Sequence, residues 1–186
     1  MKRRKWMGML LAVAAMGVAT TALGGYNVWS NEYTLSQQQL QTAIESKFPA
    51  RLRYAEVFTV DIRHPRLALN PTENRVVTIV SVSVQSQLPL VPLNGTIKLS
   101  SALKYDSQAR AIRLDNPTVD AIDFGELAAP YAQQLNEIGA IVAQRVLKDY
   151  PIYTFKPEQL RLNGKLFEPG AITVQADGIA VEVNAS

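Results

Sequence analysis

The sequence contains no cysteine and only one histidine, His64, among its 186 residues. Without cysteine the chain cannot form a disulfide, and it has no thiol to which a lipid anchor can be attached. One histidine does not supply the ligands of the usual zinc sites, and a Ser-His-Asp triad would depend on His64 alone. His64 lies between Arg63 and Pro65-Arg66, a context typical of an exposed turn. We therefore expect no catalytic residue, no metal site and no enzyme activity.

The chain has little net charge outside its first five residues. Its formal net charge is +3, and Lys2, Arg3, Arg4 and Lys5 supply more than all of it. The rest of the chain is close to neutral, without a basic stripe interleaved with aromatic residues, so nucleic acid is not an expected partner. No glycine-rich phosphate loop follows an expected strand, and no nucleotide or other cofactor is predicted.

Residues 1–25 show the three-part pattern of an export segment. The basic residues precede an uncharged stretch from Trp6 to Gly25, which has an apolar centre and closes on Ala22-Leu23-Gly24. The pattern predicts either a signal peptide cleaved after Gly24 or an N-terminal membrane anchor, because about 20 uncharged residues can just span a bilayer. Residues 26–186 then form a single envelope domain. The domain is expected in the periplasm after cleavage; otherwise residues 6–25 hold it at the inner membrane, facing the periplasm.

A short helix is predicted after Ser36. Ser36 and Gln39 form a capping box, and Leu40, Ile44 and Phe48 then repeat on one apolar face. The opposite face is expected to be solvated: Gln37, Gln38, Gln41 and Glu45.

A second, longer helix is predicted over Glu126 to Tyr150. Its apolar residues follow helical spacing and form a wide stripe. Such a stripe needs a concave apolar surface, which one face of a curled sheet supplies. The members of the stripe that form a candidate lipophilic groove are Leu127, Tyr131, Leu135, Ile138 and Val142.

Alternating apolar residues between the two helices predict β-strands, most clearly over Val76 to Val84. Asn94-Gly95 is expected to form a turn, and Asn116-Pro117 is expected to break a strand. Asp177-Gly178 predicts a hairpin near the end of the chain. The fold class is therefore α+β, with a long-stranded antiparallel meander that can curl.

Three stretches of the sequence resemble a known family. They are Tyr33-Thr34-Leu35-Ser36 before the short helix, residues 149–155 after the long one, and residues 167–174 near the end. With the export segment, they resemble the bacterial envelope proteins grouped as domain of unknown function 1439, the YceB-like lipoproteins. The resemblance implies a strongly bent antiparallel sheet wrapped around a long helix, similar to one half of the tubular lipid-binding (TULIP) superfamily. Those lipoproteins carry an acylated cysteine, which this chain lacks.

Two hypotheses for function follow. The resemblance implies a non-catalytic periplasmic protein that binds a lipid or another lipophilic ligand in the candidate groove. The alternative is a structural or assembly factor of the envelope that contacts a protein partner and holds no ligand. A proline-rich segment, expected to be an apolar edge segment or loop, supplies the candidate rim or partner surface: Leu88, Leu90, Val91 and Leu93. The stripe can also be ordinary core that fills the curled sheet, and the sequence leaves these alternatives open.

Overall fold

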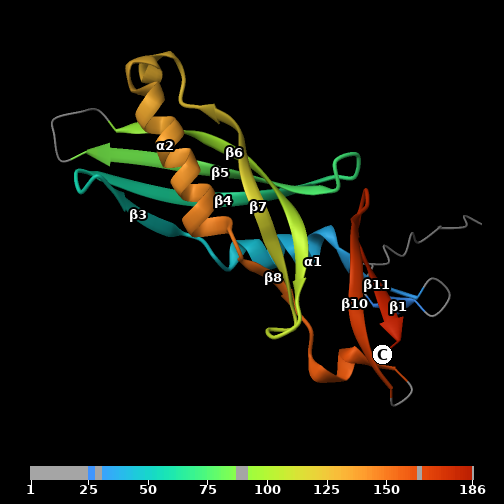
Figure 1. The fold of residues 1–186 in the computed structure, drawn as a ribbon. Helices are drawn as coiled ribbons and strands as arrows, with labels where there is room; N and C mark the ends of the chain where they lie inside the picture. The colour runs from blue at the N-terminus through green and yellow to red at the C-terminus, as the bar shows by residue number, and fades with distance from the viewer. Residues whose placement is uncertain (1–24, 28–30, 87–91, 163–164, 186) are drawn as a thin grey trace, which may run out of the picture.

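A computed structural model describes residues 25–27, 31–86, 92–162 and 165–185 of the chain (Figure 1). These residues form an α+β fold with two antiparallel sheets. One sheet has six strands in the order β3-β4-β5-β6-β7-β8, and the other has five in the order β1-β2-β11-β10-β9. Residues 1–24, which hold most of the predicted export segment, lie outside the described part.

The six-stranded sheet is strongly curled, and a helix of the C-terminal half lies beside it (Figure 1). Its four central strands are 12 to 14 residues long, which is long enough for strand twist to accumulate into curvature. The predicted antiparallel meander is confirmed. Its strands are β3 (Ala50–Tyr54), β4 (Phe58–Asn70), β5 (Arg75–Ser86), β6 (Leu93–Asp106), β7 (Ala111–Asp123) and β8 (Pro151–Thr154).

The predicted short helix is α1 (Gln37–Glu45), and its capping box is confirmed. The backbone N–H of Gln39 donates to Ser36 Oγ at 3.3 Å, and the N–H of Ser36 donates to Gln39 Oε1 at 2.9 Å. Leu40 and Ile44 are fully buried, as the spacing of the apolar face predicts.

The prediction that the opposite face of α1 is simply solvated was wrong for two glutamines. Gln37 Nε2 donates to the carbonyl oxygen of Leu67 at 3.0 Å. Gln41 Oε1 accepts from the N–H of Leu67 at 2.7 Å, and Gln41 Nε2 donates to the carbonyl oxygen of Pro65 at 2.8 Å. β3 pairs with β4 only as far as Ile62, so these side-chain amides satisfy backbone groups of β4 beyond the end of β3.

The predicted long helix is present but has three parts and ends earlier than expected. A 3₁₀ turn, η1 (Glu126–Tyr131), leads into α2 (Ala132–Val142), which continues as a π-helical turn, η2 (Ala143–Leu147). The helix stops before Tyr150 because Lys148 has an extended ψ of 133° and Asp149 has a left-handed φ of 59°.

Two predicted interruptions of the strands were wrong. Asn94 and Gly95 lie inside β6 and pair with Ser83 and Val82 of β5. The glycine is needed here for close approach, because a Cβ at Gly95 would lie 2.2 Å from the carbonyl oxygen of Asp123. Asn116-Pro117 likewise lies inside the continuous strand β7, where the register of the β6–β7 pair shifts between Ser100 and Ala102. A bulge of this kind accommodates a proline that has no N–H to donate.

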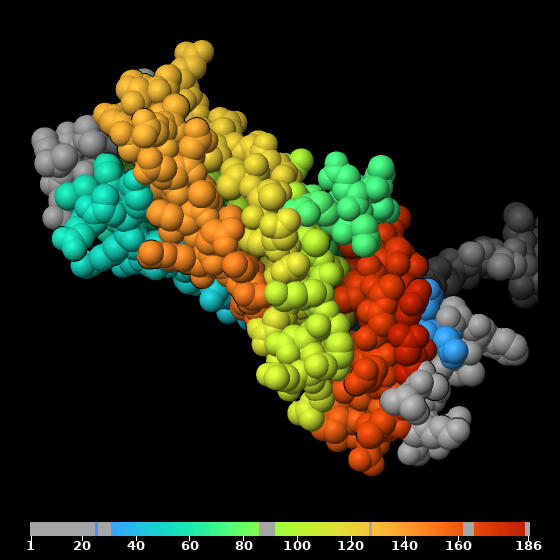
Figure 2. Space-filling model, viewed as in Figure 1, coloured from blue at the N-terminus to red at the C-terminus, as the bar shows by residue number. Residues whose placement is uncertain are grey.

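The five-stranded sheet brings the two ends of the described chain together, and in Figure 2 the blue N-terminal residues lie beside the red C-terminal strands. The hairpin predicted at Asp177-Gly178 is confirmed as β10 and β11, and β11 pairs with β2, which the sequence did not predict. The 3₁₀ turn η3 (Pro157–Leu160) precedes β9. The strands are β1 (Tyr26–Asn27), β2 (Glu32–Ser36), β9 (Arg161–Leu162), β10 (Lys165–Val174) and β11 (Gly178–Ala185).

A buried aromatic cluster joins the two sheets. The hydroxyl groups of Tyr33 in β2 and Tyr153 in β8 lie 2.8 Å apart, and Gln159 Nε2 donates to Tyr153 at 2.7 Å. The ring of Tyr33 meets Phe155 edge-on, with centroids 5.2 Å apart. Burial, together with the hydrogen bond to Tyr153, raises the pKa of the Tyr33 hydroxyl.

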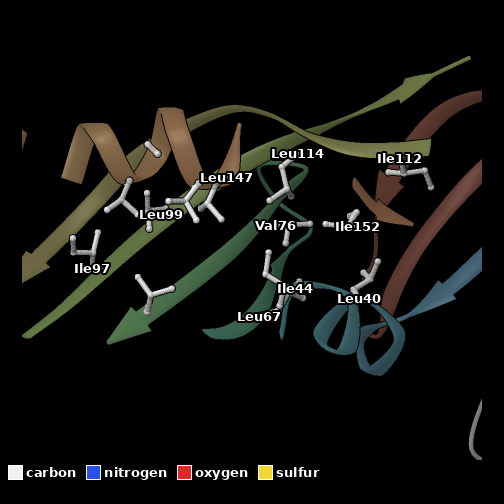
Figure 3. Packing of buried hydrophobic residues seen from close by; sticks show 14 of the residues in the cluster. Leu40, Ile44, Leu67, Val76, Ile97, Leu99, Ile112, Leu114, Leu147 and Ile152 are labelled. Carbon is white, nitrogen blue, oxygen red and sulfur yellow. The ribbon is translucent and has the colours of Figure 1, made fainter. Parts of the chain in front are cut away.

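The hydrophobic core lies between the curled sheet, α1 and the end of the long helix (Figure 3). Ile44 of α1, Leu147 of η2 and Ile152 of β8 all belong to it and are fully buried. In Figure 3 these side chains lie around Val76 of β5, so elements far apart in sequence share one core. No helix in the described part of the chain has the length and apolarity that a bilayer-spanning segment needs.

Candidate functional site

The predicted groove residues of the long helix lie on the side of the helix that meets the sheet. Leu135, Ile138 and Val142 are buried and belong to the hydrophobic core, and Tyr131 is half-buried and packs against it. Leu127 begins the same stripe, but its side chain lies outside the described part. The structure therefore brings four of the five candidate residues to one apolar surface.

The helix lies close to the sheet where α2 crosses β7. A Cβ added at Gly139 would lie 2.8 Å from Ile122 Cδ1 and 3.5 Å from Val119 Cγ2. Both of these side chains come from β7 and pack against the core. The absence of a side chain at Gly139 thus lets the helix axis approach the strand.

The sheet side of this contact is formed by alternate residues of the central strands. In β5 the predicted face from Val76 to Val84 is buried throughout, which confirms the alternation. Its neighbours on β6, Ile97 and Leu99, are fully buried. We call the apolar contact between the helix and this face of the sheet the seam.

The side chains of the seam are buried along its whole length, and their exposed fraction rises by only a few per cent from Val142 toward the N-terminal end of α2. On the helix the exposed fraction rises from 0% at Val142 through 2% at Ile138 to 5% at Leu135. On β5 it rises from 0% at Val80 through 2% at Val82 to 6% at Val84. The helix begins just after β7 ends at Asp123, opposite Thr96 of β6, so both gradients run toward the same end of the sheet.

Toward that end lie several half-buried apolar side chains, which we call the rim. Its members come from β3, β4, β6, η1 and the residue after β7, and all of them pack against the core. They are Tyr54, Phe58, Leu93, Phe124 and Tyr131.

A hydrogen bond connects the rim to the helix. The Tyr54 hydroxyl donates to Glu137 Oε2 of α2, so this side chain reaches from the edge strand β3 to the helix. The hydrogen bond to the Glu137 carboxylate raises the pKa of Tyr54. The ring of Tyr54 stacks on Phe58 with centroids 6.0 Å apart. Tyr54 thereby links β3 both to α2 and to Phe58 of the rim.

Only Tyr131 and Leu93 of the rim were among the residues singled out from the sequence. Leu88, Leu90 and Val91 lie outside the described residues. Leu93 was expected in an edge segment or loop, but it begins the central strand β6 and pairs with Val84. The signal for Tyr54 and Phe58 was present in the alternation of β3 and β4, which places Leu52, Tyr54, Phe58 and Val60 on one face.

The side chains with reactive groups do not gather at the seam. His64 is exposed in β4, where it has a left-handed φ of 50° at a register shift. Within the described residues, no three or more His, Cys, Asp or Glu side chains lie close enough together to hold a metal ion. The chemistry of the seam is therefore that of hydrocarbon and aromatic surface.

The fold and the seam together define an α+β protein with a strongly curled antiparallel sheet and a helix in its C-terminal half. The chain belongs to the domain of unknown function 1439 family, whose model, described as "Protein of unknown function (DUF1439)", matches residues 31–169. The family resemblance seen in the sequence is confirmed. The match does not bear on the similarity to the tubular lipid-binding superfamily, which stays a prediction. No curated protein matches the chain.

Proposed function

We propose that this protein is a non-catalytic periplasmic binding protein for a lipid or another lipophilic molecule. The observation that carries the proposal is the group of half-buried apolar side chains, the rim, at which the seam ends. A core built only for stability gains from sealing its ends, because exposed apolar surface costs about 25 cal/mol per Å². A rim of five half-buried apolar side chains supports the idea that another apolar molecule covers it.

The mechanism is burial of an acyl chain or ring system at the rim end of the seam. The hydrogen bond between Tyr54 and Glu137 is exposed to solvent, so breaking it exchanges one hydrogen bond for others with water. In this mechanism Tyr54, which packs against the core, moves aside and the ligand takes its place against the apolar side chains of the seam. Each methylene buried there contributes about 0.8 kcal/mol, and no directed polar contact is required.

The first experiment asks whether a ligand is present. The full chain is produced in a bacterial host, purified without detergent, and studied by native mass spectrometry and by analysis of its lipid extract. We expect a bound mass that the extract identifies as an acyl-chain compound. A protein that is ligand-free, and that also fails to bind a fluorescent fatty acid added to it, contradicts the proposal. If that ligand-free protein retains a protein partner, the assembly-factor hypothesis is favoured instead.

The second experiment places the ligand at the seam. Leu135→Trp adds bulk beside the rim and is expected to lower the affinity for the fluorescent fatty acid by roughly tenfold, at a modest cost in stability. Ala140→Trp is the matched control, because Ala140 is exposed on the same helix and its substitution should leave affinity unchanged. If Leu135→Trp leaves the affinity unchanged, the probe binds elsewhere and the seam is ordinary core.

A further inference from the structure

A surface groove of about 860 Å³, distinct from the candidate lipophilic groove of the long helix, lies beside the C-terminal end of α1. Its walls come from α1, the connection to β3, and the strands β3 and β4. The polar and charged side chains that line it include Gln41, Glu45, Arg51, Asp61, Arg63 and Arg66. The groove is independent of the seam because Arg63 and Arg66 project from the face of β4 opposite to the buried residues Ile62 and Leu67.

A bulge in β4 brings two arginines to the same face of the sheet. Arg63 pairs with Ser81 of β5 and Arg66 pairs with Ile79, so three steps along β4 match two steps along β5. In a regular strand, residues 63 and 66 would point to opposite faces, and the extra residue corrects this. Ser81 and Ile79 are about 7 Å apart at 3.4 Å per residue. Two guanidinium groups at that spacing can reach one anion.

The backbone that carries these arginines is held in place without a ligand. Gln41 bonds to Pro65 and Leu67 of β4 at 2.8 and 2.7 Å. His64, inside the bulge, has a left-handed φ of 50°, which is uncommon for a residue other than glycine. The bulge is therefore a built feature of the strand.

The carboxylates that line the groove already have partners. Asp61 accepts from Arg51 Nε at 2.6 Å, and Glu45 accepts from Gln41 Nε2 at 2.6 Å. Arg63 and Arg66 are exposed, and their side chains form no ion pair with any residue that the structure describes. Glu45 accepts only from a neutral amide and keeps its negative charge, so the three arginines and two carboxylates that line the groove leave it with a formal net charge of +1.

We propose that Arg63 and Arg66 form a binding site for a phosphate group, carried either by a lipid headgroup or by a free phosphate compound. Each guanidinium presents a planar fork of N–H donors that matches phosphate oxygens. The three acceptor oxygens of a phosphate group point in more directions than the two coplanar oxygens of one carboxylate, which favours phosphate for two forks that approach from different positions along the strand.

The test is a titration of the full chain with inorganic phosphate, followed through the backbone amide resonances of Arg63, His64 and Arg66. Arg63→Gln/Arg66→Gln is expected to weaken binding by roughly tenfold or more. Arg63→Lys/Arg66→Lys, which keeps the charge but not the forks, should show an intermediate affinity. The matched control is Arg145→Gln/Lys148→Gln, which removes two exposed charges near the end of the long helix and should bind like the unmodified chain. The thermal unfolding of each variant checks that it is folded.

A second arm distinguishes the two sources of phosphate. Co-sedimentation is measured with vesicles of phosphatidylglycerol and of phosphatidylcholine, and the zwitterionic vesicles correct for retention through residues 6–25. Retention on phosphatidylglycerol that is lost in Arg63→Gln/Arg66→Gln identifies a lipid headgroup. Phosphate-induced shifts without such retention identify a free phosphate compound. The proposal is overturned if the glutamine variant matches the unmodified chain in both arms, or if acetate at equal ionic strength gives the same shifts as phosphate.

Discussion

Replacing Gly95 with alanine tests how closely β6 and β7 approach at the rim. The added Cβ would lie 2.2 Å from the carbonyl oxygen of Asp123 and 2.5 Å from Phe124 Cγ. A carbon and an oxygen atom normally approach no closer than about 3.3 Å, so the backbones must separate by about 1 Å. The phenyl ring of Phe124 can rotate away, but the carbonyl oxygen belongs to the strand, and Asp123 pairs with Thr96 beside the glycine.

Two opposing effects set the size of the expected change. Overpacking of this kind costs about 1–3 kcal/mol, and a backbone overlap lies at the upper end of that range. Alanine also restricts the unfolded chain, which stabilises the folded state by about 0.4–1 kcal/mol. We therefore expect Gly95→Ala to lower the free energy of unfolding by about 2 kcal/mol.

Urea denaturation followed by circular dichroism measures this change. With a slope of about 2 kcal/mol per molar urea, the midpoint should fall by about 1 M while the slope stays the same. Gly25→Ala is the matched control, because its added Cβ has no atom within 4 Å. An open surface site would change the free energy of unfolding by less than about 0.5 kcal/mol. If Gly95→Ala shows so small a change, the close approach of β7 to β6 at this point is refuted.

Other substitutions test single interactions. Ser36→Ala removes the capping box of α1 and should lower the free energy of unfolding by about 1 kcal/mol in urea; no change would mean that the cap does not contribute. Tyr33→Phe removes the hydroxyl that Tyr153 contacts and should lower the free energy of unfolding by about 1–2 kcal/mol, which lowers the thermal midpoint. An unchanged midpoint would argue against this contact. Lys104 lowers the pKa of Asp149, so this pair stabilises the fold above the ordinary carboxyl pKa. This stability is lost as pH falls below about 4. In urea denaturation at a series of pH values, Lys104→Met should therefore show a smaller fall in the free energy of unfolding over that range.

The elements that sequence patterns predicted well are those whose determinants are local. The capping box at Ser36 lies next to the helix that it starts, and the Asp177-Gly178 turn lies between the two strands that it joins. The pairing of β2 with β11 has no such local signal. Tyr33 meets Val181 across almost the whole length of the chain, and its own neighbourhood indicates only that a helix follows.

Tertiary contacts overrode the local signals at the two predicted interruptions. Asn-Gly is a strong hairpin signal, but Gly95 serves the approach of Phe124 and lies within a continuous strand. Pro117 is buried in β7, where a register shift absorbs it. In both cases a contact with residues distant in sequence, and not a local turn, explains the residue type.

In the candidate site, too, some features follow from local sequence and others only from the tertiary fold. Helical spacing correctly placed Leu135, Ile138 and Val142 on one buried face. The same spacing carried no information on burial along that face, because this depends on where the strands of the sheet end. Phe124 became part of the rim only through the fold, which places it over Gly95 of the neighbouring strand.

The edge strand β3 relates the seam to the groove. Its even-numbered residues, Leu52 and Tyr54, pack toward the core, and its odd-numbered residues, Arg51 and Arg53, are exposed on the other face. A ligand at the rim and a phosphate in the groove would therefore lie on opposite faces of one strand. An acyl chain and a phosphate joined by a short linker cannot occupy both sites without passing around the edge of β3. The two proposals are thus physically separable, and the failure of one leaves the other intact.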